Sequence, residues 1–228
     1  MPDRDREDTI SRYTERYREH GYSPLTLGWK KGRQSLRFDV LTSEHGRKGA
    51  SVLDLGCGFG DLNHTLEEKF GTDYRYHGVD LVEALITEGR SRWPDSRSTF
   101  TCGDFLALPF DKQFDFAVAS GVFNHRLDGI DNYVLIEAFM DRALELCRDG
   151  FAFDFLSDKV DYPLGHTFHS SPERILAMAY SRSRNLILRN DYMPFEFSLF
   201  VFKDDGFDIE DAVFHRQKER PHGPEATK

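Results

Sequence analysis

The feature that most constrains this chain is a glycine-rich turn within Ser51–Asp61, SVLDLGCGFGD. Val52 to Leu55 is short and mostly apolar, which predicts a buried strand. Gly56, Gly58 and Gly60 follow, and glycine permits backbone dihedrals and close ligand approach that other residues resist. After the turn the apolar residues recur at helical spacing. A strand, a glycine turn and a helix in this order predict an α/β fold that binds a nucleotide-like ligand beyond the carboxyl ends of its strands.

The spacing of the glycines distinguishes two classes of ligand. A dinucleotide fingerprint, G-x-G-x-x-G, would need its third glycine at position 61, where this chain has an aspartate. The sequence from Asp54 to Gly60 instead reads D-x-G-x-G-x-G, which resembles motif I of the class I S-adenosylmethionine (SAM)-dependent methyltransferases. In that family the turn wraps the methionine end of SAM, and the leading acid helps position its amino group. The resemblance therefore implies that Asp54, Gly56, Cys57 and Gly58 hold the cofactor.

An acid at the end of each of the next two predicted strands extends the resemblance. Asp80 ends the strand predicted within Tyr74–Leu81, at the distance from the turn where an acid can bind ribose hydroxyls. The alternative is that Asp80 caps the following helix. Asp104 ends a strand predicted over Thr99–Asp104, and in the family an acid here accepts a hydrogen bond from the adenine amino group. The alternative for it is an ordinary turn residue. The resemblance implies four cofactor contacts: Asp80, Leu81, Asp104 and Phe105.

The fourth predicted strand, Lys112–Val122, resembles motif IV of the family, whose carboxyl end lies beside the reactive methyl group. Ser120 is therefore an expected cofactor contact. His125 could act as a general base because its unperturbed pKa lies close to neutral. Asn124 could orient the acceptor or the methionine part of SAM by hydrogen bonding. The alternative is a polar loop that leads into the next helix.

The C-terminal third predicts the far edge of the sheet. A helix over Tyr133–Cys147 is expected to end at Gly150, before a strand over 151–156 and a long loop to residue 171. Two β segments, 185–192 and 197–203, have so short a connection that an antiparallel hairpin is expected. Asp191 and Tyr192 flank this turn and are candidate catalytic residues. The alternative for both is ordinary turn polarity.

Together these elements predict the fold class α/β, with a Rossmann-like seven-stranded sheet that is mostly parallel and has an antiparallel terminal strand. Helices are expected on both faces. Residues 1–48 are expected to form an N-terminal helical and lid segment, 49–214 the SAM-binding domain and 215–228 a disordered tail. Within the first of these, the segment Tyr22–Lys31 is expected to fold over the cofactor.

Composition and patterning limit the partners. A formal net charge of −9 argues against a general nucleic-acid binder, and the chain lacks the N/D-P-P-Y motif of base-methylating enzymes. The charged N-terminus and the absence of an apolar run of ~20 residues argue against a signal peptide or a membrane partner. The three cysteines suit reduced thiols in a cytoplasmic protein. His166 and His169 have no evident third ligand, so no metal site is predicted. The oligomeric state is left open.

The resemblance implies an enzyme that transfers a methyl group from SAM, its cofactor, to an oxygen or nitrogen atom of a small-molecule acceptor. A hydroxyl or protonated amine would need a general base, for which His125 precedes Asp191 and Tyr192. An already ionised acceptor would need cationic partners instead, and the candidates are Lys30, Lys31, Arg126 and Arg189. Two alternatives are an NAD-dependent oxidoreductase on a related fold and a SAM-binding module without catalytic activity.

Overall fold

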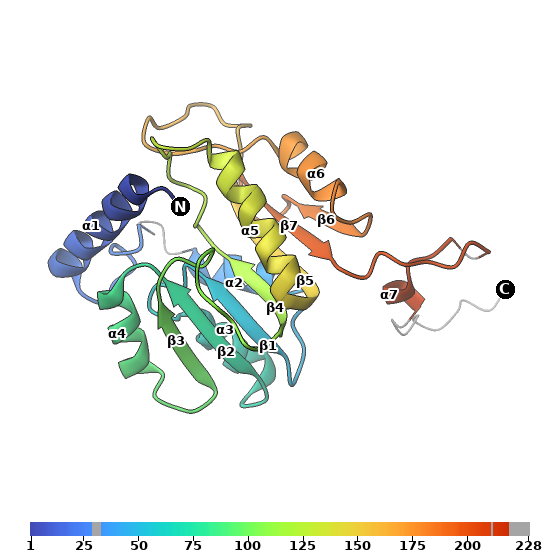
Figure 1. Cartoon of the computed structure of the whole chain (residues 1–228), viewed down its shortest axis with the longest axis horizontal. Helices are drawn as coiled ribbons and strands as arrows, with labels where there is room; N and C mark the ends of the chain where they lie inside the picture. The colour runs from blue at the N-terminus through green and yellow to red at the C-terminus, as the bar shows by residue number, and fades with distance from the viewer. Residues whose placement is uncertain (29–32, 211, 219–228) are drawn as a thin grey trace.

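The computed structural model describes residues 1–28, 33–210 and 212–218. A seven-stranded sheet with the order β3-β2-β1-β4-β5-β7-β6 forms its centre, which confirms the predicted architecture (Figure 1). The strands are β1 (Ser51–Leu55), β2 (Arg75–Asp80), β3 (Ser98–Cys102), β4 (Phe114–Ala119), β5 (Cys147–Leu156), β6 (Leu186–Arg189) and β7 (Glu196–Phe202). The helices are α1 (Asp3–His20), α2 (Gln34–Leu41), α3 (Leu62–Phe70), α4 (Glu83–Arg92), α5 (Asn132–Leu146), α6 (Pro172–Tyr180) and α7 (His215–Lys218).

Strands β1 to β5 run parallel, and β7 is the antiparallel strand of the sheet. It is inserted between β5 and β6 and pairs antiparallel with both. The predicted hairpin of the last two strands is therefore confirmed.

Both faces of the sheet are covered by helices because its strands are apolar on both sides. Val52 and Leu53 are adjacent in β1, yet they belong to different hydrophobic cores, as the two-residue period of a strand requires. Leu53 packs in the core that includes Ile136 of α5 and Ile175 of α6. Val52 packs in the core formed by residues of α2, α3 and α4. The sheet is therefore packed on both faces, and these two hydrophobic cores fix the positions of the strand ends.

One sequence-based boundary is wrong. Gly150 does not end the helix before it, because α5 stops at Leu146 and Gly150 lies inside β5. Gly150 has a φ of 137°, and the pairing register between β4 and β5 shifts at this point. A Cβ atom here would lie 1.8 Å from the carbonyl oxygen of Val201 in β7. Position 150 thus requires glycine because β7 passes close to β5 there. The two strands are distant in the sequence, so the residues around Gly150 do not reveal this contact.

The N-terminal helix α1 is attached across the carboxyl ends of the strands. Its first turn is fixed by Asp5, whose carboxylate accepts hydrogen bonds from the Asp128 and Gly129 N–H groups after β4. Further along the chain, the Tyr17 hydroxyl donates to Glu88 of α4 at 2.9 Å. Figure 1 shows α1 beyond the arrowheads of β2 and β3. The helix therefore spans the region where the cofactor-binding motifs end.

Part of the expected lid, Tyr22–Lys31, falls at positions 29–32, outside the described residues, and both candidate cations Lys30 and Lys31 are there. The described part of this segment contacts the body of the protein, because the Tyr22 hydroxyl donates to Asp61 at 2.9 Å. At the other end of the chain, α7 occupies 215–218 of the tail. Across the residues described, no helix is both long enough and apolar enough to cross a bilayer.

Candidate functional site

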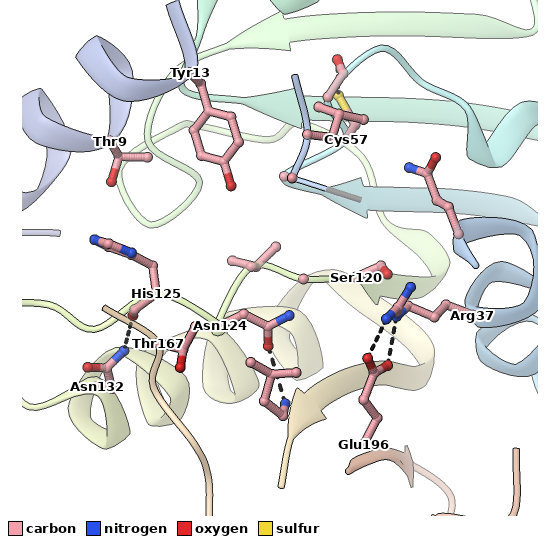
Figure 2. Close-up of a pocket in the computed structure, with 18 of the residues that line it drawn as sticks. Thr9, Tyr13, Arg37, Cys57, Ser120, Asn124, His125, Asn132, Thr167 and Glu196 are labelled. Carbon is pink, nitrogen blue, oxygen red and sulfur yellow. Dashed lines mark hydrogen bonds and ion pairs between the residues drawn. The ribbon is translucent and has the colours of Figure 1, made fainter. Parts of the chain in front are cut away.

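A cavity of about 1110 Å³ lies at the carboxyl ends of the parallel strands, under α1. Figure 2 shows Tyr13 of α1 directed into this space, with His125 and Asn124 on the opposite wall. Loops 156–169 and 192–196 complete the lining. All nine residues predicted to hold the cofactor line the cavity: Asp54, Gly56, Cys57, Gly58, Asp80, Leu81, Asp104, Phe105 and Ser120.

The glycine turn after β1 has the predicted backbone conformation, with φ values of 68°, 55° and 78° at Gly56, Gly58 and Gly60. Its close contacts are nevertheless with protein atoms. A Cβ atom on Gly56 would lie 2.6 Å from Val122, and one on Gly58 would lie 2.9 Å from Leu27. The glycines therefore allow Val122, after β4, and Leu27, in the lid segment, to approach the turn. They also leave the backbone of the turn uncovered by side chains.

Asp80 stabilises the glycine turn from the end of β2. Its carboxylate accepts hydrogen bonds from the Gly58 N–H at 2.9 Å and the Val82 N–H at 3.0 Å. Each oxygen thus keeps a lone pair for a further donor. Burial raises the pKa of this carboxyl, and the bonds from the Gly58 and Val82 N–H groups oppose that rise. Asp80 does not cap α4, whose N-cap is Val82 without a side-chain cap hydrogen bond, and it lines the cavity as an acceptor.

Asp54 in β1 is almost fully buried and accepts a hydrogen bond from the Tyr76 hydroxyl at 2.8 Å. Burial raises the pKa of Asp54 to about 7, and the neighbouring charges of Asp80 and Asp61 add to the rise. A cationic group in the cavity would reverse this effect, because a positive charge favours the ionised carboxylate. The chemistry of this acid therefore fits an ammonium ligand.

Asp104, the third predicted acid, follows β3 and has two partners in the structure. The Met1 amino group donates to one carboxylate oxygen at 2.8 Å, and the Leu106 N–H donates to the other at 3.1 Å. Phe105, the next residue, is buried and packs 5.1 Å from Phe139 of α5 between ring centroids. The acid and the ring thus border the cavity together from one loop.

Sequence reasoning missed Asp154, a buried acid in β5 beside the predicted Ser120. The Ser120 hydroxyl donates to Asp154 at 2.6 Å, and the Gly121 N–H donates to its other oxygen at 2.7 Å. Burial raises the pKa of Asp154 to about 6. These bonds fix the end of β4. An aspartate in an otherwise apolar strand, FAFDFL, is the signal that could have identified it.

His125 and Asn124 are held by the loop after β4. The His125 carbonyl accepts a hydrogen bond from the Asn132 side chain at 2.7 Å, and the imidazole ring of His125 lines the cavity (Figure 2). Burial lowers the pKa of His125, and the charges of Arg12 and His166 lower it further. The Asn124 side-chain oxygen accepts from the Leu156 N–H at 3.2 Å, so its amide nitrogen remains as a donor.

The structure separates the two other catalytic candidates. Tyr192 lines the cavity, and its hydroxyl is hydrogen-bonded to Ser198 at 2.8 Å. Burial raises the pKa of this phenol, so Tyr192 is suited to donate a hydrogen bond and not to act as a base. Asp191 is exposed, pairs with Arg189 at 3.8 Å and does not line the cavity. The expectation that Asp191 reaches the pocket is therefore corrected.

The two described arginines that were candidate partners for an ionised acceptor lie outside the cavity. Arg189 pairs with Glu44, and Arg126 donates to the Thr167 carbonyl at 3.4 Å; neither lines the cavity.

Of the two histidines of the loop after β5, His166 is exposed and lines the cavity. His169 is partly buried, and its ring nitrogens are hydrogen-bonded to the Thr167 hydroxyl at 2.9 Å and to the Ser157 carbonyl at 2.8 Å. Across the residues described, no group of three or more His, Cys, Asp or Glu side chains is placed to hold a metal ion.

Two further features were not found from the sequence. The first is a buried ion pair on the cavity wall, in which the Arg37 Nε donates to Glu196 at 2.7 Å (Figure 2). The second is the cavity-facing side of α1, which carries Arg12, Tyr13 and Arg16. The sequence predicted a helical segment within residues 1–48, but it did not indicate which surface this helix covers.

Comparison with known proteins matches residues 52–150 to a methyltransferase domain family. A Mycobacterium tuberculosis protein named as a candidate methyltransferase is 31% identical over 160 residues, which cover 67% of this chain and 93% of that protein. The chloroplastic 2-phytyl-1,4-beta-naphthoquinone methyltransferase of Arabidopsis thaliana is 39% identical over 82 residues. That match covers 33% of this chain and 31% of the Arabidopsis protein, so the chain spans about a third of this relative.

A solved structure with a similar fold is that of magnesium protoporphyrin IX methyltransferase from Synechocystis PCC 6803 with bound SAM. Its TM-score is 0.63 at 15% sequence identity, and the match covers 86% of this chain and 97% of that chain. At this identity the likeness concerns the fold.

Proposed function

The chain belongs to the class I SAM-dependent methyltransferases, and on this premise we propose that it transfers a methyl group from SAM to an oxygen or nitrogen atom of a small molecule. The observation that carries the proposal is one shared cavity. Asp54, Asp80 and Asp104 line it together with Asn124 and His125 of the loop after β4. A cofactor and an acceptor bound in one cavity can be held in the collinear arrangement that displacement requires.

The acid-lined half of the cavity would hold the cofactor. Asp54 would face the methionine amino group, and the remaining lone pairs of Asp80 would accept from the ribose hydroxyls. Asp104 and Phe105 would contact adenine, with the adenine amino group competing with the Met1 amino group for Asp104. When bound, SAM supplies an electrophilic methyl group on a sulfonium sulfur. The chain's part is to orient this group toward the end of β4, near Ser120 and Asn124.

The opposite half would hold the acceptor. A ring nitrogen of His125 would take the proton that the acceptor O–H or N–H loses as its oxygen or nitrogen bonds to the methyl carbon and the carbon–sulfur bond breaks. The lowered pKa of His125 keeps its ring neutral at pH 7, as a base requires. Tyr192 and the Asn124 amide would donate hydrogen bonds that orient the acceptor. Asp191 has no part in this arrangement because it lies outside the cavity.

The small-molecule class of the acceptor is supported by the lining of the cavity. Helix α1 and the loops after β5 and β6 all contribute residues to its wall, so an acceptor would reach the methyl group between them. The Arabidopsis relative is named for a naphthoquinone acceptor, also a small molecule. Family membership sets aside the oxidoreductase alternative, while a SAM-binding module without turnover is the outcome against which the proposal is tested.

The test is calorimetric titration of the protein with SAM, S-adenosylhomocysteine (SAH) and NAD, followed by a screen for acceptor-dependent SAH release. We expect micromolar binding of SAM and SAH, no binding of NAD, and turnover with a hydroxyl- or amine-bearing small molecule. Absence of SAM and SAH binding contradicts the proposal, and binding without turnover across the screen favours the non-catalytic module.

A further inference from the structure

The ionisable side chains that line the cavity differ between its two ends. The acids Asp54, Asp80 and Asp104 lie together at the ends of the first three strands. Arg12, Arg16 and His166 line the cavity near His125, and their charges lower the pKa of this histidine while that of Asp128 raises it. Asp161, in the loop after β5, is the acid that lines the cavity beside this cluster. The acid-lined half has the charge that suits a sulfonium, an ammonium and a ribose. The other half has the charge that suits an anion.

Arg12 and Arg16 lack the carboxylate partners that other partly buried arginines of this protein have. Arg12 Nη2 donates to the Thr9 hydroxyl at 3.2 Å, and its guanidinium lies 5.7 Å from the centroid of the Tyr13 ring. The Arg16 guanidinium lies 5.5 Å from the same centroid. Among the described residues neither arginine forms an ion pair, and Asp8 raises the pKa of Arg12 only through space.

An unpaired, partly buried cation is unfavourable because it loses hydration without gaining a compensating charge. Burial accordingly lowers the pKa of Arg12. Arg37 lines the same cavity and shows the contrast, because its guanidinium forms a buried ion pair with Glu196. An anionic ligand beside Arg12 and Arg16 would supply the missing partner, and guanidinium groups bind carboxylate and phosphate with paired hydrogen bonds.

Large, exposed apolar side chains also line the cavity. Tyr162 and Leu164 of the loop after β5 are 73% and 50% exposed, and Phe195 is 48% exposed. All three also line the cavity. Phe195 has a φ of 68°, a conformation that bulky residues rarely adopt and that structures retain where surrounding contacts enforce it. Large apolar side chains that line a cavity favour a ligand with an apolar body.

We propose that the methyl acceptor is an amphipathic acid whose carboxylate or phosphate group binds Arg12 and Arg16, and whose apolar body lies against Tyr162, Leu164 and Phe195. This inference rests on the proposed function, because it identifies the class of molecule that receives the methyl group. The two arginines act as binding residues for the acceptor, and His125 remains the proton acceptor.

The experiment uses the full chain saturated with SAH and two calorimetric ligands of the same apolar body, the anionic 3-phenylpropanoate and the neutral 3-phenylpropanamide. We expect wild-type protein to bind the acid at least about tenfold more tightly than the amide, as charge-assisted hydrogen bonds to a guanidinium imply. The double variant Arg12→Gln, Arg16→Gln is expected to lose this preference. Arg12→Lys should keep most of it, and Arg18→Gln, on the exposed side of α1, should keep all of it.

The affinity of every variant for SAH is measured before the acid and amide are compared. Equal binding of the two ligands by wild type, or a preference that survives in the double variant, overturns the inference. A double variant that loses SAH affinity while keeping the acid preference also overturns it, because the arginines would then serve the carboxylate of the cofactor. A wild-type protein that binds no SAH contradicts the proposed function itself, and the inference falls with it.

Discussion

Asp5 and Gly129 are 124 residues apart, yet the Gly129 N–H is shared between both carboxylate oxygens of Asp5, at 3.2 and 3.0 Å. Asp5 is only 4% exposed, and it also accepts from the Asp128 N–H. This acid connects the first turn of α1 to the loop that carries Asn124 and His125. The position of the helix over the cavity therefore depends on a buried hydrogen-bonded contact.

Replacing Asp5 with alanine should weaken the closure of the cavity. The two N–H groups would lose their acceptor, and leaving such buried donors unsatisfied costs about 1–3 kcal/mol. We expect faster SAH dissociation, measured by stopped-flow, and a lower free energy of unfolding. Glu7→Ala, an exposed acid of the same helix, is the matched control and should change neither quantity. Equal dissociation rates for Asp5→Ala and wild type would show that α1 does not retain the ligand.

Asp80→Ala should weaken SAM binding by at least about 1–3 kcal/mol, because ribose hydroxyls would lose their acceptor and the Gly58 N–H would lose its partner. Isothermal calorimetry measures this directly. Asp80→Asn keeps one carbonyl oxygen and is expected to fall between alanine and wild type. SAM affinity unchanged in Asp80→Ala would remove the ribose assignment.

SAM binding should release the proton of the Asp54 carboxyl group. The pKa of this carboxyl is raised to about 7 by burial, and an adjacent ammonium group would lower it by stabilising the ionised form. Near pH 6 the free protein holds the proton and the complex does not, so affinity should rise with pH until about pH 8. Calorimetry in buffers of different ionisation enthalpy counts the proton. Asp54→Asn should abolish the buffer dependence in this pH range, and a wild-type enthalpy independent of buffer would contradict the assignment.

His125→Ala should lower turnover by roughly 10²- to 10⁴-fold, the usual contribution of a general base, while SAH affinity stays unchanged. The pH profile gives a second test. Burial lowers the pKa of His125 below its ordinary 6.5, and the base must be neutral, so the acidic limb of wild-type kcat/KM for the acceptor should lie below pH 6.5. Turnover of His125→Ala equal to that of wild type would exclude the role, as would a limb at higher pH that survives the substitution.

Gly150→Ala should destabilise the fold by at least about 2 kcal/mol, because the new methyl group would overlap the Val201 carbonyl at 1.8 Å and force β5 and β7 apart. Gly165→Ala is the matched control, since a Cβ atom there meets nothing within 4 Å. Denaturant unfolding compares the two. If both substitutions change the free energy of unfolding equally, the close strand approach at Gly150 is not a constraint on the fold.

The fold and the residues that line the acidic half of the cavity were predictable because their signals are local. Asp54 lies in β1 two residues before Gly56, Asp80 ends β2 and Asp104 follows β3, and parallel strands deliver their carboxyl ends to one edge. Asp80 illustrates this, since its strand, its distance from the turn and its charge can all be read within one stretch of chain.

The acceptor half depends on contacts between distant segments, and no local pattern encodes them. Arg37 and Glu196 pair across 159 residues, and Gly150 is a glycine because of Val201 in another strand. Asp191 and Tyr192 are adjacent, but only the tyrosine reaches the cavity. Whether Asp191 or Tyr192 turns inward depends on where β6 ends, which is at Arg189. Residue propensities locate such a strand end only to within a few residues.

The insertion of β7 between β5 and β6 has a consequence for biosynthesis. Until residues up to Phe202 have left the ribosome, the outer edge of β5 has no partner, and a nascent chain presents it as an open template for pairing with other chains. The cavity is also incomplete at that stage, because its wall needs Glu196 as well as Tyr13 from the first helix. The complete cavity therefore exists only after β7 has been added, and until then the order of folding or a chaperone would protect this edge.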